Sequence, residues 1–114
     1  MAQTTKYIWF NGELVEWDKA QVHVMTHALH YGSSVFEGIR AYDTPAGPAI
    51  FRLKEHIQRL FPSAKTSWMD MPYSKEAICE ACRVIVRENG LKSGYLRPLA
   101  FVGNVGLGLH PPKD

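Results

Sequence analysis

The amino-acid sequence predicts an α+β fold, a two-layer arrangement in which two helices pack on one side of a largely antiparallel sheet. Three observations lead to this prediction: short apolar runs bounded by turn residues open the chain, two amphipathic helical segments occupy its middle, and another strand precedes a glycine-rich segment near its end. Because the strands do not alternate strictly with helices, a parallel sheet of βαβ units is not expected. The 114 residues suffice for one domain, and we expect residues 1–114 to form it.

The first strands are predicted at residues 7–10 and 14–17, on either side of Asn11 and Gly12. Both turn residues accept the positive φ of a type I′ turn, so this segment should form a hairpin. A second pair of strands is predicted at residues 35–42 and 49–53, because a turn-rich link joins them.

The segment between the two pairs gives weaker signals. Residues 21–25 alternate only weakly, and residues 27–33 are turn-like.

The first helix is expected over residues 53–65, where apolar side chains recur at helical spacing and form one stripe: Leu53, Ile57, Leu60, Phe61 and Ala64. Pro62 lies inside this segment. Proline removes a backbone hydrogen bond and usually kinks or ends a helix, so we expect a break near it.

The second helix is expected to begin after Ser74, a suitable N-cap, and to stop at Asn89 and Gly90. Its buried face should contain Ile78, Ala81, Cys82 and Ile85. The last strand is predicted over residues 96–102, where Pro98 indicates an edge or a bulge.

Composition and charge exclude several classes of protein. The chain is 46% hydrophobic and 21% charged, with a formal net charge of +2, and no run of Lys or Arg points to nucleic acid or an anionic membrane surface. Its longest uncharged stretch, residues 98–112, is shorter than the ~20 apolar residues that a membrane helix needs. The first residues lack the pattern of a secretory signal. We therefore expect a cytoplasmic domain.

The two cysteines, Cys79 and Cys82, have CxxC spacing but fall in the middle of the second predicted helix. A zinc site would need a second pair of ligands, and a redox pair normally lies at a helix N-terminus. The sequence therefore predicts two core cysteines.

Two further motifs also have simpler structural explanations. His23, His27 and His30 would share one face only if residues 21–31 formed a single helix, which the alternation around His23 opposes, so we expect local hydrogen bonds and no metal site. The glycine-rich residues 103–108 match neither the Walker nor the dinucleotide pattern.

Strand periodicity places two groups of side chains on shared faces. Tyr95 and Arg97 point the same way, as do Phe36, Gly38 and Arg40. Aromatic surface, a guanidinium and free space would suit a small carboxylic acid. The same pattern also fits a half-exposed sheet face whose arginines extend to water.

Arg59 lies about 145° from the centre of the apolar stripe of the first helix, counted at about 100° per residue. A solvated arginine is the simplest expectation there. A functional Arg59 would need something to lie over the outer face of the helix, and no segment of the sequence is an obvious candidate.

Four runs resemble the N-terminal part of branched-chain amino-acid aminotransferases, pyridoxal-phosphate enzymes of fold type IV. These runs are YIWFNGELVEW, VHVMTHALHYGSSVFEGIRAY, FRLKEHIQRLFPSAK and YLRPLAFVGNVGLGLHPP. The resemblance covers essentially the whole chain in order, and it implies that residues 1–114 correspond to the family's small N-terminal domain, an α+β layer. The block HALHYGSSVFEGIR followed by EHIQRL is specific to the class.

The resemblance implies a cofactor contact and contacts with both carboxylates of glutamate. Arg59 matches the arginine that holds the phosphate of pyridoxal 5′-phosphate. Tyr95 matches a residue near the substrate α-carboxylate. Arg97 matches the group that receives the side-chain carboxylate of glutamate, and Tyr31 contributes to this from the neighbouring subunit.

The resemblance also implies a pocket for the apolar side chains of leucine, isoleucine and valine. Phe36 and Gly38 match its wall and floor, and Leu109 with its loop would reach into the adjacent subunit's site. The implied partners are an amino acid, a 2-oxo acid, a C-terminal domain of the same enzyme, and a second copy of the chain in at least a dimer.

By the same resemblance, the lysine that forms the Schiff base belongs to the C-terminal domain, beyond Asp114. The resemblance therefore implies no catalytic residue within this chain. The complete enzyme would move an amino group between branched-chain L-amino acids and 2-oxoglutarate, while the chain alone should be inactive. A D-amino-acid aminotransferase or an aminodeoxychorismate lyase of the same fold is the nearest alternative. A non-catalytic binding module is the alternative from another class.

Overall fold

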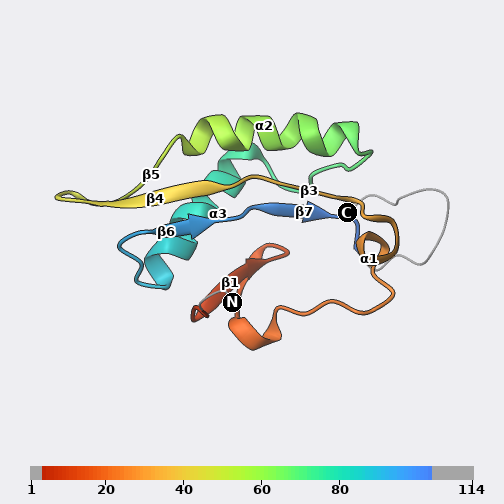
Figure 1. The fold of residues 1–114 in the computed structure, drawn as a ribbon, viewed down its shortest axis with the longest axis horizontal. Helices are drawn as coiled ribbons and strands as arrows, with labels where there is room; N and C mark the ends of the chain where they lie inside the picture. The colour runs from red at the N-terminus through yellow and green to blue at the C-terminus, as the bar shows by residue number, and fades with distance from the viewer. Residues whose placement is uncertain (1–3, 104–114) are drawn as a thin grey trace.

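The computed structural model describes residues 4–103 (Figure 1). Strands β1 (Tyr7–Phe10) and β2 (Glu13–Glu16) form the expected antiparallel hairpin, with Tyr7 opposite Glu16. Its two turn residues, Asn11 and Gly12, have φ values of 50° and 93°, as a type I′ turn requires. A short 3₁₀ turn, η1 (Trp17–Lys19), follows.

Five more strands form two antiparallel sheets. Strand β4 (Ile39–Thr44) lies between β5 (Gly47–Ile50) and β6 (Gly94–Leu96), and β3 (Ser34–Phe36) pairs with β7 (Leu99–Phe101). All these pairings are antiparallel, which confirms the predicted sheet type.

The long strands predicted over residues 35–42 and 96–102 are each divided in two. The divisions lie opposite one another, and the backbone N–H of Glu37 donates to the carbonyl of Pro98 at 3.1 Å across them. Pro98 has no N–H to return, so the regular ladder is interrupted here. The strand predicted to reach residue 53 ends at Ile50, where the chain turns into a helix.

Helices α2 (Leu53–Thr66) and α3 (Lys75–Glu88) share one core with the sheet. Ile39, Ala41 and Leu96 project from the sheet into this core, where they meet side chains of both helices: Leu53 and Ile57 of α2, and Ile78, Cys79, Cys82 and Val86 of α3. Both helices therefore cover the same face of the sheet, as the sequence predicts.

The expected break near Pro62 is wrong, because α2 continues through this residue to Thr66. Pro62 and Gln58, whose carbonyl would have accepted the missing N–H, are both exposed. The lost hydrogen bond is therefore on the water side of the helix, where solvent replaces it. The buried side chains of Ile57, Leu60 and Ala64 keep the helix on the core.

Replacing Pro62 with alanine should stabilise the chain by about 1–3 kcal/mol, because the new N–H completes the helical hydrogen bond to Gln58. Urea denaturation followed by circular dichroism measures this gain. The matched control is Lys65→Ala, one turn further along the exposed side, which should change the unfolding free energy little. A loss of stability in Pro62→Ala would show that the proline is favourable in this helix.

Residues 27–33, expected to be turn-like, contain a short helix instead, α1 (His27–Tyr31), and residues 21–25 form no strand. The helix ends at Gly32, whose φ of 67° is the left-handed conformation common after a helix. The backbone N–H groups of His27 and Ala28 donate to the carbonyls of Gly103 and Val102, so α1 is attached to the chain just beyond β7 (Figure 1).

Candidate functional site

The segment that joins β3 to β4 presents different side chains to its two faces. Phe36 and Arg40 are exposed on one face, with Gly38 between them, while Glu37 and Ile39 are buried on the helix side. The predicted shared face of Phe36, Gly38 and Arg40 is therefore present. Glu37 is only 7% exposed, so its carboxylate needs partners that supply charge and hydrogen bonds.

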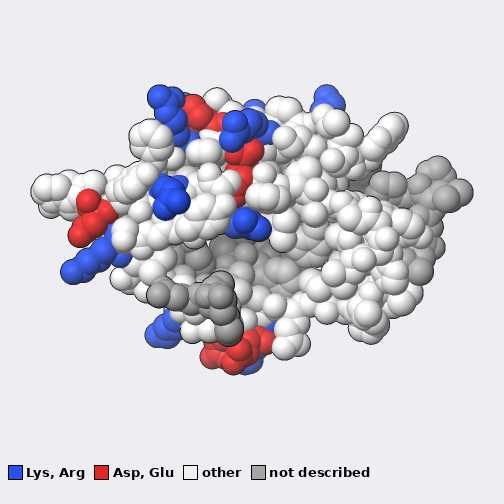
Figure 2. Space-filling view, viewed as in Figure 1, with Lys and Arg blue, Asp and Glu red and all other residues white. Residues whose placement is uncertain are grey.

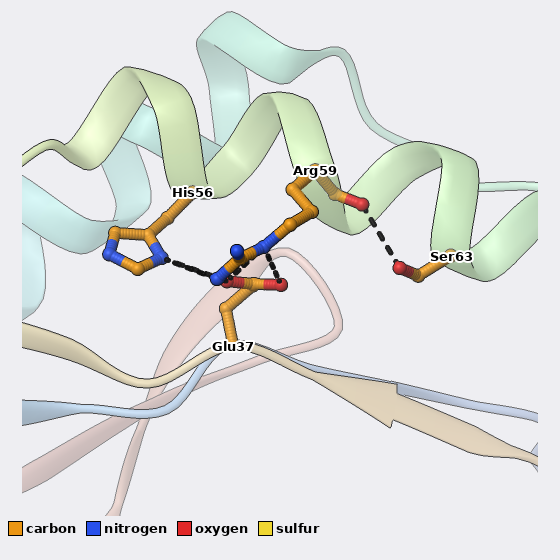
Figure 3. Close-up of polar contacts among 4 residues, drawn as sticks. All are labelled: Glu37, His56, Arg59 and Ser63. Atoms are coloured by element: carbon orange, nitrogen blue, oxygen red, sulfur yellow. Dashed lines mark hydrogen bonds and ion pairs between the residues drawn. The ribbon is translucent and has the colours of Figure 1, made fainter.

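Arg59 and His56 of α2 supply those partners (Figure 3). The Nε of Arg59 donates to both carboxylate oxygens of Glu37, at 3.1 and 3.0 Å, and its Nη2 donates to Oε1 at 2.6 Å. His56 Nδ1 donates to the same Oε1 at 2.8 Å. Ser63 Oγ donates to the backbone carbonyl of Arg59 at 3.1 Å, one turn away.

Arg59 is largely exposed, as expected of a solvated arginine, but it also has a partner, Glu37, that the sequence analysis did not identify. The missed signal lies in the strand alternation, because residue 37 falls on the helix side between two exposed positions. An acidic residue there requires a cation on the facing helix, and Arg59 and His56 lie one turn apart on α2.

Hydrogen bonds from Arg59, and secondarily from His56, lower the pKa of the Glu37 carboxyl below its ordinary value, although burial opposes the change. The same pairing raises the pKa of Arg59. Glu37 is therefore ionised, and the cluster joins a carboxylate to a guanidinium whose side chain remains 68% exposed.

Acid should destabilise the chain through Glu37. A carboxyl with a lowered folded-state pKa stabilises the fold above its unfolded pKa, near 4.5, and this contribution is lost as pH falls through the lower folded value. Urea denaturation at pH values from 7 to about 3 measures this loss. The difference in unfolding free energy between the wild type and Glu37→Gln should become smaller as the pH falls below about 4.5. A difference independent of pH would contradict an ionised Glu37, and Glu80→Gln is the exposed control.

Arg59 retains donors suited to an anion. Glu37 uses the edge formed by Nε and Nη2, and the planar guanidinium has a second edge, formed by Nη1 and the other proton of Nη2. A guanidinium oriented by a buried carboxylate and open to solvent suits a phosphate, which accepts two parallel hydrogen bonds. The residues present therefore fit a phosphate-bearing cofactor at Arg59.

On the other face of the same segment, the predicted substrate residues form a cluster. The guanidinium carbon of Arg97 lies 4.4 Å from the centre of the Phe36 ring and 5.8 Å from that of Tyr95. Gly38 lies under the Tyr95 side chain, since a Cβ at this position would overlap the Tyr95 hydroxyl oxygen and lie 3.0 Å from Cζ. Four of the predicted site residues are thus brought together.

Tyr31 is placed separately, on α1, where its ring is 4.5 Å from that of His27 and 6.4 Å from that of His30. Leu109 lies outside the described residues. Two hollows in the described part of the chain are lined by other residues: one of about 670 Å³ between β5 and α3, and one of about 120 Å³ beside the β1–β2 turn. Phe36 and Tyr95 are each more than half exposed, so the candidate substrate residues occupy an open face.

On the face of the molecule shown in Figure 2, basic and acidic side chains are mixed with one another. Acidic and basic groups alternate over the part of the surface near α2, while the part toward α1 is largely uncharged. Exposed apolar residues gather at and before α1: Val22, Val24, Met25, Leu29 and Tyr31.

The cysteine pair is part of the core, whereas residues 104–108 of the glycine-rich motif lie outside the described residues. Cys79 and Cys82 are buried in α3, which confirms the two predicted core cysteines, and burial raises the pKa of Cys82 to about 12. Among residues 4–103 no group of three or more His, Cys, Asp or Glu is arranged to hold a metal ion. No helix in this part of the chain has the length and apolarity needed to span a membrane.

Comparison with known proteins places these features in a family. The model of the class IV amino-transferases matches residues 34–114, which include α2 and the joined β3–β4 segment. The chain belongs to the class IV aminotransferases.

Relatives within this family are branched-chain-amino-acid aminotransferases. The enzyme of Escherichia coli strain K12 is 58% identical over 112 residues, and that of Pseudomonas aeruginosa is 57% identical over 109 residues. Each alignment covers 96% of this chain and 36% of the relative. The chain thus spans about a third of the length of these class IV aminotransferases.

Solved class IV structures have the same fold. The Escherichia coli branched-chain amino acid aminotransferase has a TM-score of 0.92 at 57% identity, covering 96% of this chain and 36% of that one. A second branched-chain amino acid aminotransferase, complexed with N-(5′-phosphopyridoxyl)-L-glutamate, has the same TM-score and coverage at 52% identity. The predicted fold class and family resemblance are both confirmed.

Proposed function

We propose that residues 1–114 are the small N-terminal domain of a longer, pyridoxal-phosphate-dependent branched-chain amino-acid aminotransferase. The observation that carries the proposal is that one short segment, residues 36–38, separates two complementary groups. Arg59, oriented by Glu37, lies on the helix side, and the cluster of Phe36, Tyr95 and Arg97 lies on the other. The named relatives supply the reaction and the substrate class.

In this proposal Arg59 holds the cofactor phosphate. Pyridoxal phosphate, when bound, supplies the electron sink that allows the amino group to be transferred. Glu37 keeps the guanidinium in one orientation and His56 supports the carboxylate, so the binding edge of Arg59 is set before the anion arrives. A guanidinium that is already paired on one edge still leaves its second edge for the phosphate.

The open face provides the substrate contacts. Tyr95 lies near the α-carboxylate, Phe36 and Gly38 bound the side-chain pocket, and Arg97 receives the second carboxylate of glutamate, with Tyr31 and Leu109 of a neighbouring subunit completing the site. The position of Arg97 over the Phe36 ring suits a pocket that accepts both apolar and acidic side chains, because an aromatic wall and a guanidinium lie side by side.

The proposal also assigns an assembly and a compartment. The complete protein would act in the cytoplasm as a homo-oligomer, at least a dimer, on small amino acids and 2-oxo acids. The exposed apolar residues around α1 support an intersubunit contact there, because contiguous apolar patches on a surface commonly mark interfaces.

Transamination by the complete polypeptide tests the function. With pyridoxal phosphate, L-leucine and 2-oxoglutarate, it should release glutamate, while the 114-residue chain under the same conditions should not. The intact mass of the protein from its natural source establishes the length of the polypeptide. Rejection of L-leucine in favour of D-amino acids, release of pyruvate from aminodeoxychorismate, or turnover by the chain alone would contradict the proposal.

Replacing Gly38 with alanine in the complete enzyme should lower kcat/KM for both leucine and glutamate by about tenfold, because the added methyl displaces the Tyr95 ring from its position. Steady-state kinetics measure the change. Gly94→Ala, on the strand that carries Tyr95, is the control, since its Cβ would meet only Leu91 at an ordinary 3.6 Å. Equal kinetics for the two variants would contradict this role of Gly38.

A further inference from the structure

Helix α1 is too short to hold its own shape. It contains five residues, and isolated helices of this length do not persist in water. Its last residue, Tyr31, is 57% exposed, so little packing restricts the tyrosine from outside. The orientation of Tyr31 must therefore come from the residues that attach α1 to the rest of the fold.

His27 is the central attachment. It is 6% exposed, its backbone N–H donates to the carbonyl of Gly103, and its Nδ1 lies 2.6 Å from the hydroxyl of Ser33, beyond the other end of the helix. Ser33 is itself fixed, because its carbonyl accepts the N–H of Val102 at 3.0 Å. The His27–Ser33 bond thus ties the two ends of α1 to each other and to the end of β7.

The ring of His27 also supports Tyr31 directly. Their centroids are 4.5 Å apart and their planes are tilted by 38°, a contact distance at which aromatic rings stabilise one another. Since His27 is held at both its backbone and its Nδ1, its ring forms a rigid surface for a tyrosine that is otherwise open to solvent.

We propose that His27, held by Ser33, is a positioning residue that fixes the Tyr31 ring and thereby sets the affinity of the enzyme for its dicarboxylate substrate. This inference rests on the proposed function, in which Tyr31 helps to receive the side-chain carboxylate of glutamate. Beyond that function, His27 touches no substrate itself. Its effect should be limited to dicarboxylate substrates, because leucine presents no second carboxylate to Tyr31.

The test uses the complete enzyme. His27→Ala should raise KM for glutamate and 2-oxoglutarate about two- to tenfold, the range expected from one aromatic contact. KM for leucine and kcat should change less than twofold. His27→Phe keeps a ring against Tyr31 but loses the bond to Ser33, so His27→Phe and Ser33→Ala should both give an intermediate loss. Ser34→Ala, at the exposed position next to Ser33, is the control and should behave as the wild type.

A double-mutant cycle with Tyr31→Ala separates action through Tyr31 from a general loss of structure. If His27 acts through Tyr31, His27→Ala should add no further loss once Tyr31 is absent. Additive losses, an equal rise in KM for leucine, or no rescue by phenylalanine would overturn the proposal.

A crystal structure of the His27→Ala enzyme gives a readout independent of catalysis, in which Tyr31 should leave its wild-type position. An unmoved ring would also overturn the inference. Failure of the proposed function itself appears separately, as a wild-type enzyme that does not transaminate leucine.

Discussion

Replacing Arg59 with alanine should weaken pyridoxal-phosphate binding to the complete apoenzyme by about ten- to a hundredfold, the range that hydrogen bonds to a charged group provide. The proposed phosphate contact uses a planar pair of donors, and alanine supplies neither the donors nor the charge. Titration of the apoenzyme with the cofactor, followed by absorbance, measures the change.

Arg59→Lys should recover only part of the affinity, because an ammonium cannot donate to Glu37 and a phosphate through two planar edges. Arg83→Ala is the matched control, since this arginine lies on α3 and forms an exposed ion pair with Glu80. Unchanged cofactor affinity in Arg59→Ala would refute the phosphate role.

The Arg59 variant also needs a check on the fold, because it leaves the buried carboxylate of Glu37 with His56 as its remaining partner in the cluster. Glu37→Gln combined with Arg59→Ala removes this unpaired charge. If the phosphate role is correct, the double variant should regain thermal stability without regaining cofactor affinity. Recovery of both would show that Arg59 acts only through the fold.

Replacing Ile57 with alanine should destabilise the chain by about 2–5 kcal/mol, a large share of the ~5–15 kcal/mol that stabilises a typical domain. Ile57 is 0% exposed and packs where α2, α3 and the sheet meet, so truncation removes contacts to all three and leaves a cavity. Urea denaturation followed by circular dichroism measures the loss.

Gln58→Ala, the next residue along α2 and exposed, is the control and should change stability by less than about 0.5 kcal/mol. A loss below about 1 kcal/mol in Ile57→Ala would show that the core collapses around the smaller side chain or that α2 contributes little to the fold.

Local signals predicted the elements that depend on neighbouring residues. The hairpin followed from Asn11 and Gly12, because the backbone conformation of a two-residue turn is decided by the turn residues themselves. Helix α3 followed from its N-cap, Ser74, whose hydroxyl accepts the N–H of Ala77 at 3.1 Å, and from its apolar stripe. The shared face of Phe36 and Gly38 followed from strand alternation alone.

The errors lie where distant contacts override a local preference. Pro62 does not end α2, because the buried residues on the opposite side of the helix outweigh one hydrogen bond lost to water. Residues 27–31 form a helix because His27 and Ala28 find acceptors at Gly103 and Val102, more than 70 positions away along the chain. No window of neighbouring residues contains that information.

The sequence by itself determined the antiparallel α+β layer, the apolar faces of its two long helices and, through its motifs, the family of aminotransferases to which the chain belongs. Only the tertiary structure decided that Arg59 is oriented by Glu37 and His56, that Arg97 lies against Phe36, and that Tyr31 rests on His27. Periodicity reports the face on which a side chain lies, whereas these pairs depend on where two elements cross, and that is set by the packing of the whole core.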